Sequence, residues 1–378
     1  MNAQMRKVYN YLLSGIADGS LKPGVQIPTE KAISNSFHTN RMNVTRSLQI
    51  LRTQRLLRSN KKAGTIVHPD ADIEYAHTLL HENSRTVLLL YSKSPQYIHW
   101  DTSSFEALES ELKKKNYSIV YKHIPGDKKR ESLRHMLSRA VTNEVTAIVL
   151  FPDTDDTAYI DENCDLFISL KPEVFFLNRG SRVSRFDFTS CIELDNYGDG
   201  IAMGRIIAAN KYSKVVILGD VNSPDFWHAR RMEGVIAGFK AETGVSHGCM
   251  LTGKNDYGKV MDIIRNDTDK SEIFIAALNQ YYASVFIDFC IKENLHAGKD
   301  FNIAAFDDNP QYRSYNVTSF AVPFQYIGSM FGKLILGELC DSRLKRKITL
   351  RVNSHFIQRT SCRPLKVSGA LGINTIPV

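Results

Sequence analysis

The chain has 378 residues, 43% of them hydrophobic and 23% charged, which suits two or three globular domains and excludes wholesale disorder. Its apolar runs are strand-sized and none reaches the ~18–20 residues of a membrane helix, which argues against a membrane-spanning protein. The first residues lack the apolar core of a signal peptide, so we expect a cytoplasmic protein.

The net charge of +8 is concentrated in the first fifth of the sequence. Residues 1–70 contain eleven Lys or Arg and three acids, whereas the remainder is balanced. A basic segment attached to a neutral body is expected to bind a polyanion, although a merely solvated basic surface is the alternative. The six cysteines are dispersed without a Cys-x-x-Cys pair, so we expect free thiols and neither a disulfide framework nor a metal site.

The N-terminal segment has the pattern of a winged helix-turn-helix. Apolar positions recur at helical spacing from Val8 to Ile16, and Gly19 closes this first helix. Thr29 is the expected N-cap of a second, short helix. A third helix follows the break at 38–40, and two short helices joined by a tight turn form a helix-turn-helix. Two strands complete the prediction of a basic wing, at 56–59 and 65–67.

The rest of the chain predicts an α/β body. Residues 70–84 are polar and mildly helical, so we interpret them as a linker. Beyond them strands and helices alternate, which implies doubly wound parallel sheets with helices on both faces. Their number over about 280 residues indicates two lobes. The predicted strands are 86–91, 117–122, 146–151, 173–177, 191–194, 214–218, 273–278 and 302–306, and the predicted helices are 103–115, 129–140, 198–210, 229–242, 257–265, 281–293 and 325–338.

The N-terminal pattern resembles the GntR winged-helix family over about residues 4–68. The matching blocks are Gly19-x-Leu21-x-Pro23-Gly24, Ile27-Pro28-Thr29-Glu30, Asn40-Arg41-Met42-Asn43-Val44, Leu48-x-x-Leu51 and Gly64-Thr65. The resemblance implies that the residues around Arg41 begin a recognition helix in the major groove, while the wing approaches the minor groove. Thr45 replaces the family's usual Arg and Lys62 replaces the first wing glycine, so we expect an altered operator preference.

The residue types in these positions suit DNA contacts. Arg41 can donate two bonds to guanine O6 and N7, and Asn40 or Asn43 can bond adenine or phosphate. Lysines at the wing tip suit phosphate, which positions the protein without specifying sequence. Arg46 and Arg52 can alternatively lie on solvated helix faces. The predicted DNA-binding residues are Thr29, Glu30, Asn40, Arg41, Asn43, Thr45, Arg46, Lys61, Lys62 and Gly64.

The body resembles the LacI-type sensor domain, related to periplasmic sugar-binding proteins, over about residues 85–366. The matching blocks lie at 192–200, 231–234, 277–283, 305–308 and 356–361. The resemblance implies an effector between two lobes, at the carboxyl ends of their strands. The predicted domains are a winged helix at 1–69, the linker, and an effector domain at 85–378, with lobe 1 at about 85–190 and 321–340 and lobe 2 at about 191–320 and 341–366.

The matching positions also imply effector contacts. Arg231 is expected to donate to ligand oxygens as a rigid fork. The two tryptophans can stack on a sugar face or simply pack within their lobes, and an aspartate in the position of Asp307 is more often a structural turn residue than a ligand contact. The predicted effector residues are Trp100, Asp101, Asn178, Trp227, Arg231, Tyr257, Asn279, Gln280, Asp307 and Phe324. Asn178 and Gln280 replace carboxylates of the family, which leaves a sugar, sugar acid, sugar phosphate or nucleoside open.

The sequence argues against an enzyme. Residues 198–204 imitate a dinucleotide loop, but Met203 stands where a third glycine should allow close packing. No nucleophile elbow or zinc-protease motif occurs, so we expect no cofactor. We predict a homodimeric repressor of carbohydrate-utilisation genes that binds operator DNA, and activation stays open. The alternatives are a solute-binding protein, disfavoured by the basic segment, and a sugar- or nicotinamide-dependent enzyme.

Overall fold

The structure is a computed structural model. It describes residues 3–60, 63–83, 85–91, 99–124, 135, 137, 145–152, 160, 163–170, 172–178, 189–220, 226–244, 249–252, 256–266, 273–339 and 347–367. The chain divides into two compact units, which are Met1–Leu90 with Asn116–Val149 and Ser169–Val174, and Tyr91–Lys115 with Leu150–Ile168 and Phe175–Val378. In these described residues, no helix combines the length and the apolar character needed to cross a membrane.

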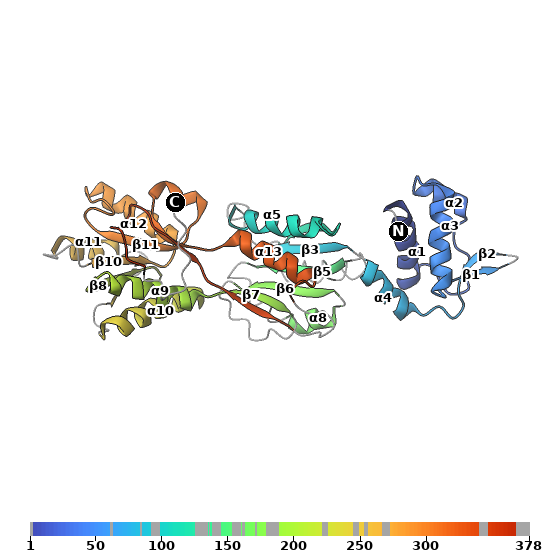
Figure 1. Ribbon diagram of the computed structural model, residues 1–378, viewed down its shortest axis with the longest axis horizontal. Coiled ribbons are helices and arrows are strands. Elements are labelled where there is room, and N and C mark those ends of the chain that lie inside the picture. Colours follow the sequence, from blue (N-terminus) through green and yellow to red (C-terminus); the bar gives the residue numbers. More distant parts are fainter. Residues whose placement is uncertain are drawn as a thin grey trace. The chain divides into compact units, whose positions relative to one another are not determined.

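The first unit begins with the predicted winged helix. Helices α1 (Ala3–Ala17), α2 (Glu30–Ser36) and α3 (Arg41–Thr53) precede an antiparallel ribbon of β1 (Leu57–Asn60) and β2 (Gly64–Val67) (Figure 1). The apolar faces of the three helices pack in one hydrophobic core. Its residues include Val8, Leu12, Ile16, Val44, Leu48 and Leu51. The helices and strands predicted here are confirmed.

Side-chain caps set where the two short helices begin. Thr29 Oγ1 accepts a bond from the Ala32 amide at 3.2 Å, as predicted for an N-cap. Asn40 Oδ1 accepts from the Asn43 amide at 2.9 Å and starts α3 in the same way. Each cap satisfies a backbone N–H that the first helical turn leaves without a partner. The turn between α2 and α3 is therefore fixed by polar side chains at both of its ends.

A further helix belongs to this core. Residues 73–83, within the segment predicted as a mildly helical linker, form α4 (Ile73–Asn83). Its Ala76, Leu79 and Leu80 are buried in the core of the winged helix, where α4 contacts α1. The segment predicted as a linker thus contains a helix that packs on the winged helix.

Two six-stranded sheets form the α/β body, as predicted. One has the order β13-β7-β6-β5-β3-β4 and the other β14-β12-β11-β10-β8-β9. Strands of the first are β3 (Thr86–Tyr91), β4 (Ser118–His123), β5 (Val145–Phe151), β6 (Glu173–Asn178), β7 (Ser190–Leu194) and β13 (Thr349–Val352). Strands of the second are β8 (Lys214–Leu218), β9 (Cys249–Thr252), β10 (Ile273–Ala277), β11 (Asn302–Asp307), β12 (Thr318–Ala321) and β14 (His355–Ile357).

Most of the predicted helices are present. The helices of the body are α5 (His99–Lys113), α8 (Cys164–Ser169), α9 (Asn196–Ala209), α10 (Phe226–Thr243), α11 (Tyr257–Asn266), α12 (Gln280–Lys292) and α13 (Phe324–Ile335). The predicted helix at 129–140 lies outside the described residues except for 135 and 137. The sequence did not predict α8 or the short strands β9, β12, β13 and β14.

The second sheet positions the residues of the candidate effector site. Strands β10 and β11 are buried along their whole length, as expected for parallel strands covered on both faces. Figure 1 shows α9 and α10 on one side of this sheet and α11 and α12 on the other. β8, β10 and β11 are neighbouring parallel strands, so their carboxyl ends meet at one edge.

Helices α9 and α10 pack backbone against backbone. A Cβ on Gly200 would lie 2.5 Å from the Arg231 carbonyl oxygen, and one on Gly238 would overlap the Ile201 carbonyl. Gly204 and Gly234 are equally close to the backbone of the facing helix. The glycines that imitate a dinucleotide loop therefore permit close packing of two helices.

Candidate DNA interface and effector site

The first two turns of α3 present an exposed polar face. Arg41, Met42, Thr45 and Arg46 are all exposed. Glu30, at the start of α2, accepts from Arg41 Nε at 3.1 Å and from Thr45 Oγ1 at 3.2 Å. An exposed ion pair of this kind adds little stability, so its main consequence is the orientation of Arg41. The terminal nitrogens of Arg41 have no partner within the described part of the chain and can donate outward.

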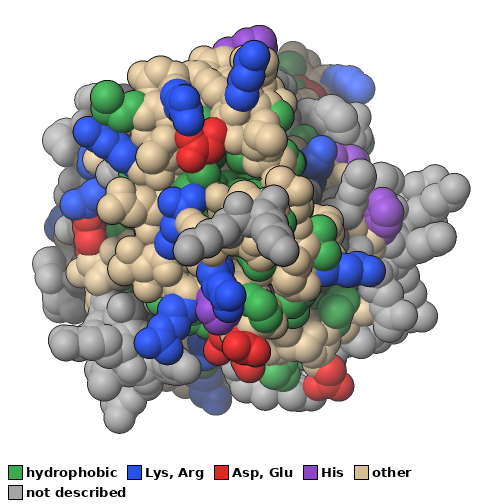
Figure 2. Space-filling model, turned by 90° about the vertical axis from the view of Figure 1, so that its right-hand side faces the viewer, with side chains coloured by type: hydrophobic (Ala, Val, Ile, Leu, Met, Phe, Trp, Pro, Cys, Tyr) green, Lys and Arg blue, Asp and Glu red, His purple; other side chains and the backbone are tan. Residues whose placement is uncertain are grey.

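The wing is fastened to α3. Arg52 Nη2 donates to Thr65 Oγ1 at 2.8 Å, so this arginine, predicted as a candidate for a solvated face, joins α3 to β2. A pocket of about 490 Å³ lies between the start of α2 and the wing and includes Arg41, Gly64 and Thr65 in its lining. On the face that Figure 2 shows, Lys and Arg side chains are spread widely among uncharged ones.

The predicted DNA contacts at the two asparagines and at the tip of the wing have different outcomes. Asn43 is buried and its Nδ2 donates to Thr39 Oγ1 at 2.9 Å, so its side chain faces the protein and not the exposed surface of α3. Asn40 is exposed, but its side-chain oxygen is used as the cap of α3. Lys61 and Lys62 lie outside the described residues.

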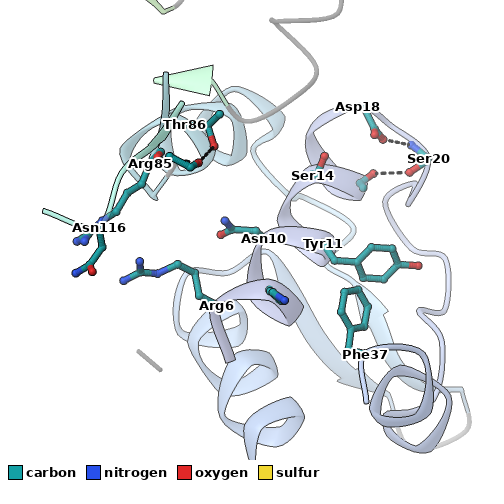
Figure 3. Close-up of a pocket in the computed structure, with 13 residues that line it drawn as sticks. Arg6, Asn10, Tyr11, Ser14, Asp18, Ser20, Phe37, Arg85, Thr86 and Asn116 are labelled. Atoms are coloured by element: carbon teal, nitrogen blue, oxygen red, sulfur yellow. Dashed lines mark hydrogen bonds between the residues drawn. The ribbon is translucent and has the colours of Figure 1, made fainter. Parts of the chain in front are cut away.

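A second pocket in the first unit has a volume of about 900 Å³. Arg6, Asn10 and Ser14 of α1 line it together with residues that adjoin β3 and β4 (Figure 3). The rings of Tyr11 and Phe37 lie 5.1 Å apart there and join α1 to the end of α2. None of the predicted effector residues lines this pocket, so it is not the site expected from the strand ends.

Arg231 is the centre of a buried polar cluster in the second unit. Its Nε donates to Asn196 Oδ1 at 2.9 Å, its Nη1 to the Leu278 carbonyl at 2.8 Å, and its Nη2 to Asp307 Oδ1 at 2.5 Å. The Trp227 and Phe306 rings lie 4.7 and 4.8 Å from the guanidinium carbon. Arg231 therefore uses three of its five N–H donors on the protein itself and joins α9, α10, β10 and β11.

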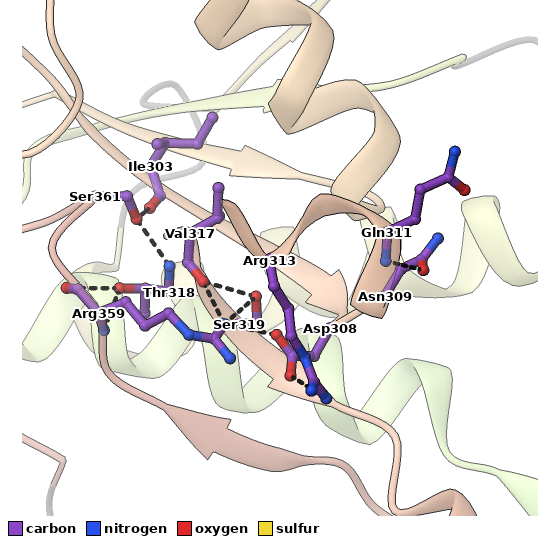
Figure 4. Close-up of polar contacts among 10 residues, drawn as sticks. All are labelled: Ile303, Asp308, Asn309, Gln311, Arg313, Val317, Thr318, Ser319, Arg359 and Ser361. Atoms are coloured by element: carbon purple, nitrogen blue, oxygen red, sulfur yellow. Dashed lines mark hydrogen bonds and ion pairs between the residues drawn. The ribbon is translucent and has the colours of Figure 1, made fainter. Parts of the chain in front are cut away.

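The backbone at the end of β11 is strained, and two arginines bind its carboxylates. Asp307 and Asp308 have φ values of 90° and 54°, which residues other than glycine rarely adopt. Arg231 holds the carboxylate of Asp307, and Arg359 Nη1 donates to Asp308 Oδ1 at 2.6 Å and to the Val317 carbonyl at 2.7 Å (Figure 4). The closing block of the sequence therefore fixes this edge of the sheet.

Asp199 connects α9 to the segment between β13 and β14. Its carboxylate accepts from the Ser354 amide at 3.0 Å and from Ser354 Oγ at 2.6 Å. Burial raises the pKa of Asp199 to about 6, although the bonds from Ser354 and Asn353 and the charge of Arg231 act in the opposite direction. Protons near neutral pH therefore control the charge of this connection.

His228 and Gln280 are buried beside this cluster and have no hydrogen-bond partner in the described part of the chain. Burial and then the charge of Arg231 lower the pKa of His228 to about 4, so the imidazole is neutral near pH 7. Gln280 is a predicted effector residue. His228 was missed, and its position three residues before Arg231 in the first turn of α10 is the only signal that the sequence offers.

The remaining predicted effector residues are dispersed over both sheets. Asn279 caps α12 by accepting from the Tyr282 amide at 2.9 Å. Tyr257 begins α11 and its ring lies 5.8 Å from that of Phe286, within apolar packing. Asn178 is buried at the end of β6 and Phe324 begins α13. Trp100 and Asp101 begin α5, but their side chains lie outside the described residues. The structure thus brings together Trp227, Arg231 and Asp307, and Asn279 and Gln280 directly follow Leu278, whose carbonyl accepts from Arg231.

A comparison with known protein families identifies the N-terminal segment that forms the winged helix. Residues 4–67 match the family described as "Bacterial regulatory proteins, gntR family". These residues form a gntR-family DNA-binding domain. The resemblance predicted from the sequence blocks of this segment is therefore confirmed, and α3 and the wing both lie within the matched residues.

Several proteins similar to most of the chain are transcription regulators. An arabinose metabolism transcriptional repressor of Geobacillus stearothermophilus is 21% identical over 308 residues, which are 79% of this chain and 80% of that repressor. A LacI family regulator of Enterococcus faecium, solved with bound ribose, has a TM-score of 0.56 and 17% identity and covers 74% of this chain and 100% of its own. A Weissella paramesenteroides LacI family regulator with bound glucose has a TM-score of 0.56 and 13% identity over 74% and 98% of the two chains. The body behind the gntR domain has the LacI-type fold.

Proposed function

We propose that this chain is a sequence-specific repressor of carbohydrate-utilisation genes, controlled by a sugar-like effector. The gntR domain carries the proposal, because its fold and family are those of a DNA reader. The similarity to a repressor of arabinose metabolism, and to LacI-type regulators solved with ribose and glucose, supports the sugar-like effector. The relatives are regulators and not enzymes, which supports a non-catalytic role.

The geometry of α3 supports a specific way of reading DNA. With α3 in the major groove, Glu30 holds Nε of Arg41 and leaves its terminal nitrogens to donate to a guanine. Arg46, five residues after Arg41, lies about 140° further around the helix, at the other margin of the exposed face, and suits phosphate. The protein acts in the cytoplasm as a homodimer, so that two gntR domains contact the two halves of a roughly palindromic operator.

The effector site is proposed at the carboxyl edge of β8, β10 and β11. Ligands bind at such edges in open α/β sheets, and here the edge collects Trp227, Arg231 and Asp307. We expect two conformations that differ in their affinity for DNA. An effector that binds the low-affinity conformation more tightly shifts the equilibrium toward it and so favours release from the operator.

Fluorescence anisotropy with labelled promoter fragments tests the DNA-binding part. Arg41→Ala should weaken specific binding by about 5- to 150-fold, because a lost bidentate base contact costs about 1–3 kcal/mol. Lys240→Ala removes one exposed positive charge from α10, outside the gntR domain, and should leave the affinity unchanged. Equal binding by wild type and Arg41→Ala would remove α3 as the reading helix. Addition of L-arabinose, D-ribose or D-glucose should release the wild-type protein from its operator.

A further inference from the structure

Two buried polar side chains at the proposed effector edge lack partners. His228 is 5% exposed and Gln280 is 1% exposed. Both ring nitrogens of His228 and both amide atoms of Gln280 are without a hydrogen bond among the described residues. An unsatisfied buried polar group costs about 1–3 kcal/mol, and such groups are rare unless a function requires them.

The topology brings both residues to the same edge. His228 lies in the first turn of α10, which follows β8, and Gln280 is the first residue of α12, which follows β10. β8 and β10 are paired in parallel, with Leu218 opposite Ala277, so the two helices begin at the same edge of the sheet. The ring of His228 lies 5.7 Å from that of Tyr282, two residues beyond Gln280.

The same edge connects these side chains to the Arg231 cluster. The Trp227 ring lies 3.6 Å from the His228 ring and 4.7 Å from the Arg231 guanidinium. The first residues of α10 thus place an aromatic face, a neutral imidazole and a guanidinium close together. Gln280 follows Leu278 by two residues, and the Leu278 carbonyl accepts from Arg231.

Both arginines in the first turns of α10 are already paired with carboxylates. Arg231 pairs with Asp307, and its neighbour Arg230 donates to Glu233 at 3.0 Å. The unpartnered groups are neutral: an imidazole with one donor and one acceptor, and an amide with two donors and an acceptor. Hydroxyl groups both donate and accept, so they can satisfy each of these atoms without adding charge.

The geometry points to His228 and Gln280 as direct contacts of the effector, each hydrogen-bonded to a ligand hydroxyl. The inference rests on the proposed function, in which the effector is sugar-like, and it adds the residues that select the ligand. Arg231 provides the central donor, while His228 and Gln280 provide groups that gain hydrogen-bond partners only when the ligand is bound.

Shape-conserving variants test this inference. His228→Phe keeps a buried ring and Gln280→Met keeps the chain length, but both remove the hydrogen-bonding atoms. Replacing an unsatisfied polar group by an apolar one of similar shape is neutral or stabilising, so the melting temperature without ligand should stay equal or rise. Isothermal titration with L-arabinose, D-ribose and D-glucose should show at least a tenfold loss of affinity for the sugar that wild type binds. His296→Phe, an exposed histidine in the same unit, is the matched control and should bind normally.

The outcomes separate this inference from the proposed function. Normal sugar affinity in both variants overturns it, whatever their stability, because water or protein atoms then satisfy His228 and Gln280. A wild-type protein that binds none of the three sugars refutes a neutral-sugar effector and this inference with it. A wild type that binds sugar, beside variants that bind it equally well, refutes only the role of the two side chains. Operator binding should persist in both variants, which shows that the gntR domain is intact.

Discussion

His228 and Asp199 should give the second unit two opposing pH dependences of stability. The pKa of His228 falls from 6.5 to about 4 on folding, chiefly through burial and the charge of Arg231, against the attraction of Asp307 and Asp220. The pKa of Asp199 rises from 3.8 to about 6 through burial, against its bonds from Ser354. Acidification therefore acts on the two groups with opposite sign.

The signs and magnitudes follow from proton linkage. Below pH 6.5 the unfolded chain protonates His228 while the folded protein does not, so the free energy of unfolding falls by about 3 kcal/mol between pH 6.5 and 4. For Asp199 the folded protein takes the proton first, so the free energy of unfolding rises by about 3 kcal/mol as pH falls from 6 to 3.8. The two contributions nearly cancel in the wild-type protein.

Single variants remove the cancellation. Relative to wild type, His228→Phe should gain about 3 kcal/mol of stability on acidification from pH 7 to 4, and Asp199→Asn should lose about as much. Urea unfolding at several pH values, followed by tryptophan fluorescence, measures both differences, and His296→Phe serves as the control. If both variants change in the same direction, or neither departs from wild type with pH, the burial of these two groups does not control their protonation.

Three further predictions concern stability. Arg231→Met should lower the free energy of unfolding in urea by about 3–5 kcal/mol, because it leaves the Asp307 carboxylate buried without its partner. Adding Asp307→Asn should restore part of that loss, and a loss below about 1 kcal/mol contradicts a buried pair. Gly238→Ala should cost about 1–3 kcal/mol by forcing α9 and α10 apart, whereas Gly258→Ala, in open space on a helix, should be neutral or slightly stabilising, and equal melting temperatures for the two variants refute the close packing. Thr29→Ala should lower the stability of the gntR domain by about 1 kcal/mol in thermal unfolding, and no change shows that the cap is dispensable.

Local sequence signals were sufficient for the gntR domain and for the parallel sheets. The caps at Thr29 and Asn40 act within three residues of their own position, so the sequence around each one specifies the helix start. The continuous apolar runs of β10 and β11 are equally local, because burial on both faces removes any need for alternation.

Features that depend on distant partners escaped prediction. β13 and β14 have four and three residues, too few for a periodic pattern, and they exist because they pair with β7 and β12. The donors of Arg231 meet acceptors 35, 47 and 76 residues away, so the sequence predicted a ligand-binding arginine but not its internal ion pair. His228 is notable for the partners it lacks, a property that no sequence pattern records.

The glycine contact between α9 and α10 has a mechanical consequence. Because the two backbones touch without intervening side chains, we expect the two helices to move together as one stiff element. One end of this element carries Arg231, and its other helix, α9, begins two residues after the end of β7, a strand of the first sheet. If the proposed effector moves the Arg231 guanidinium, we therefore expect the movement to reach β7 through α9.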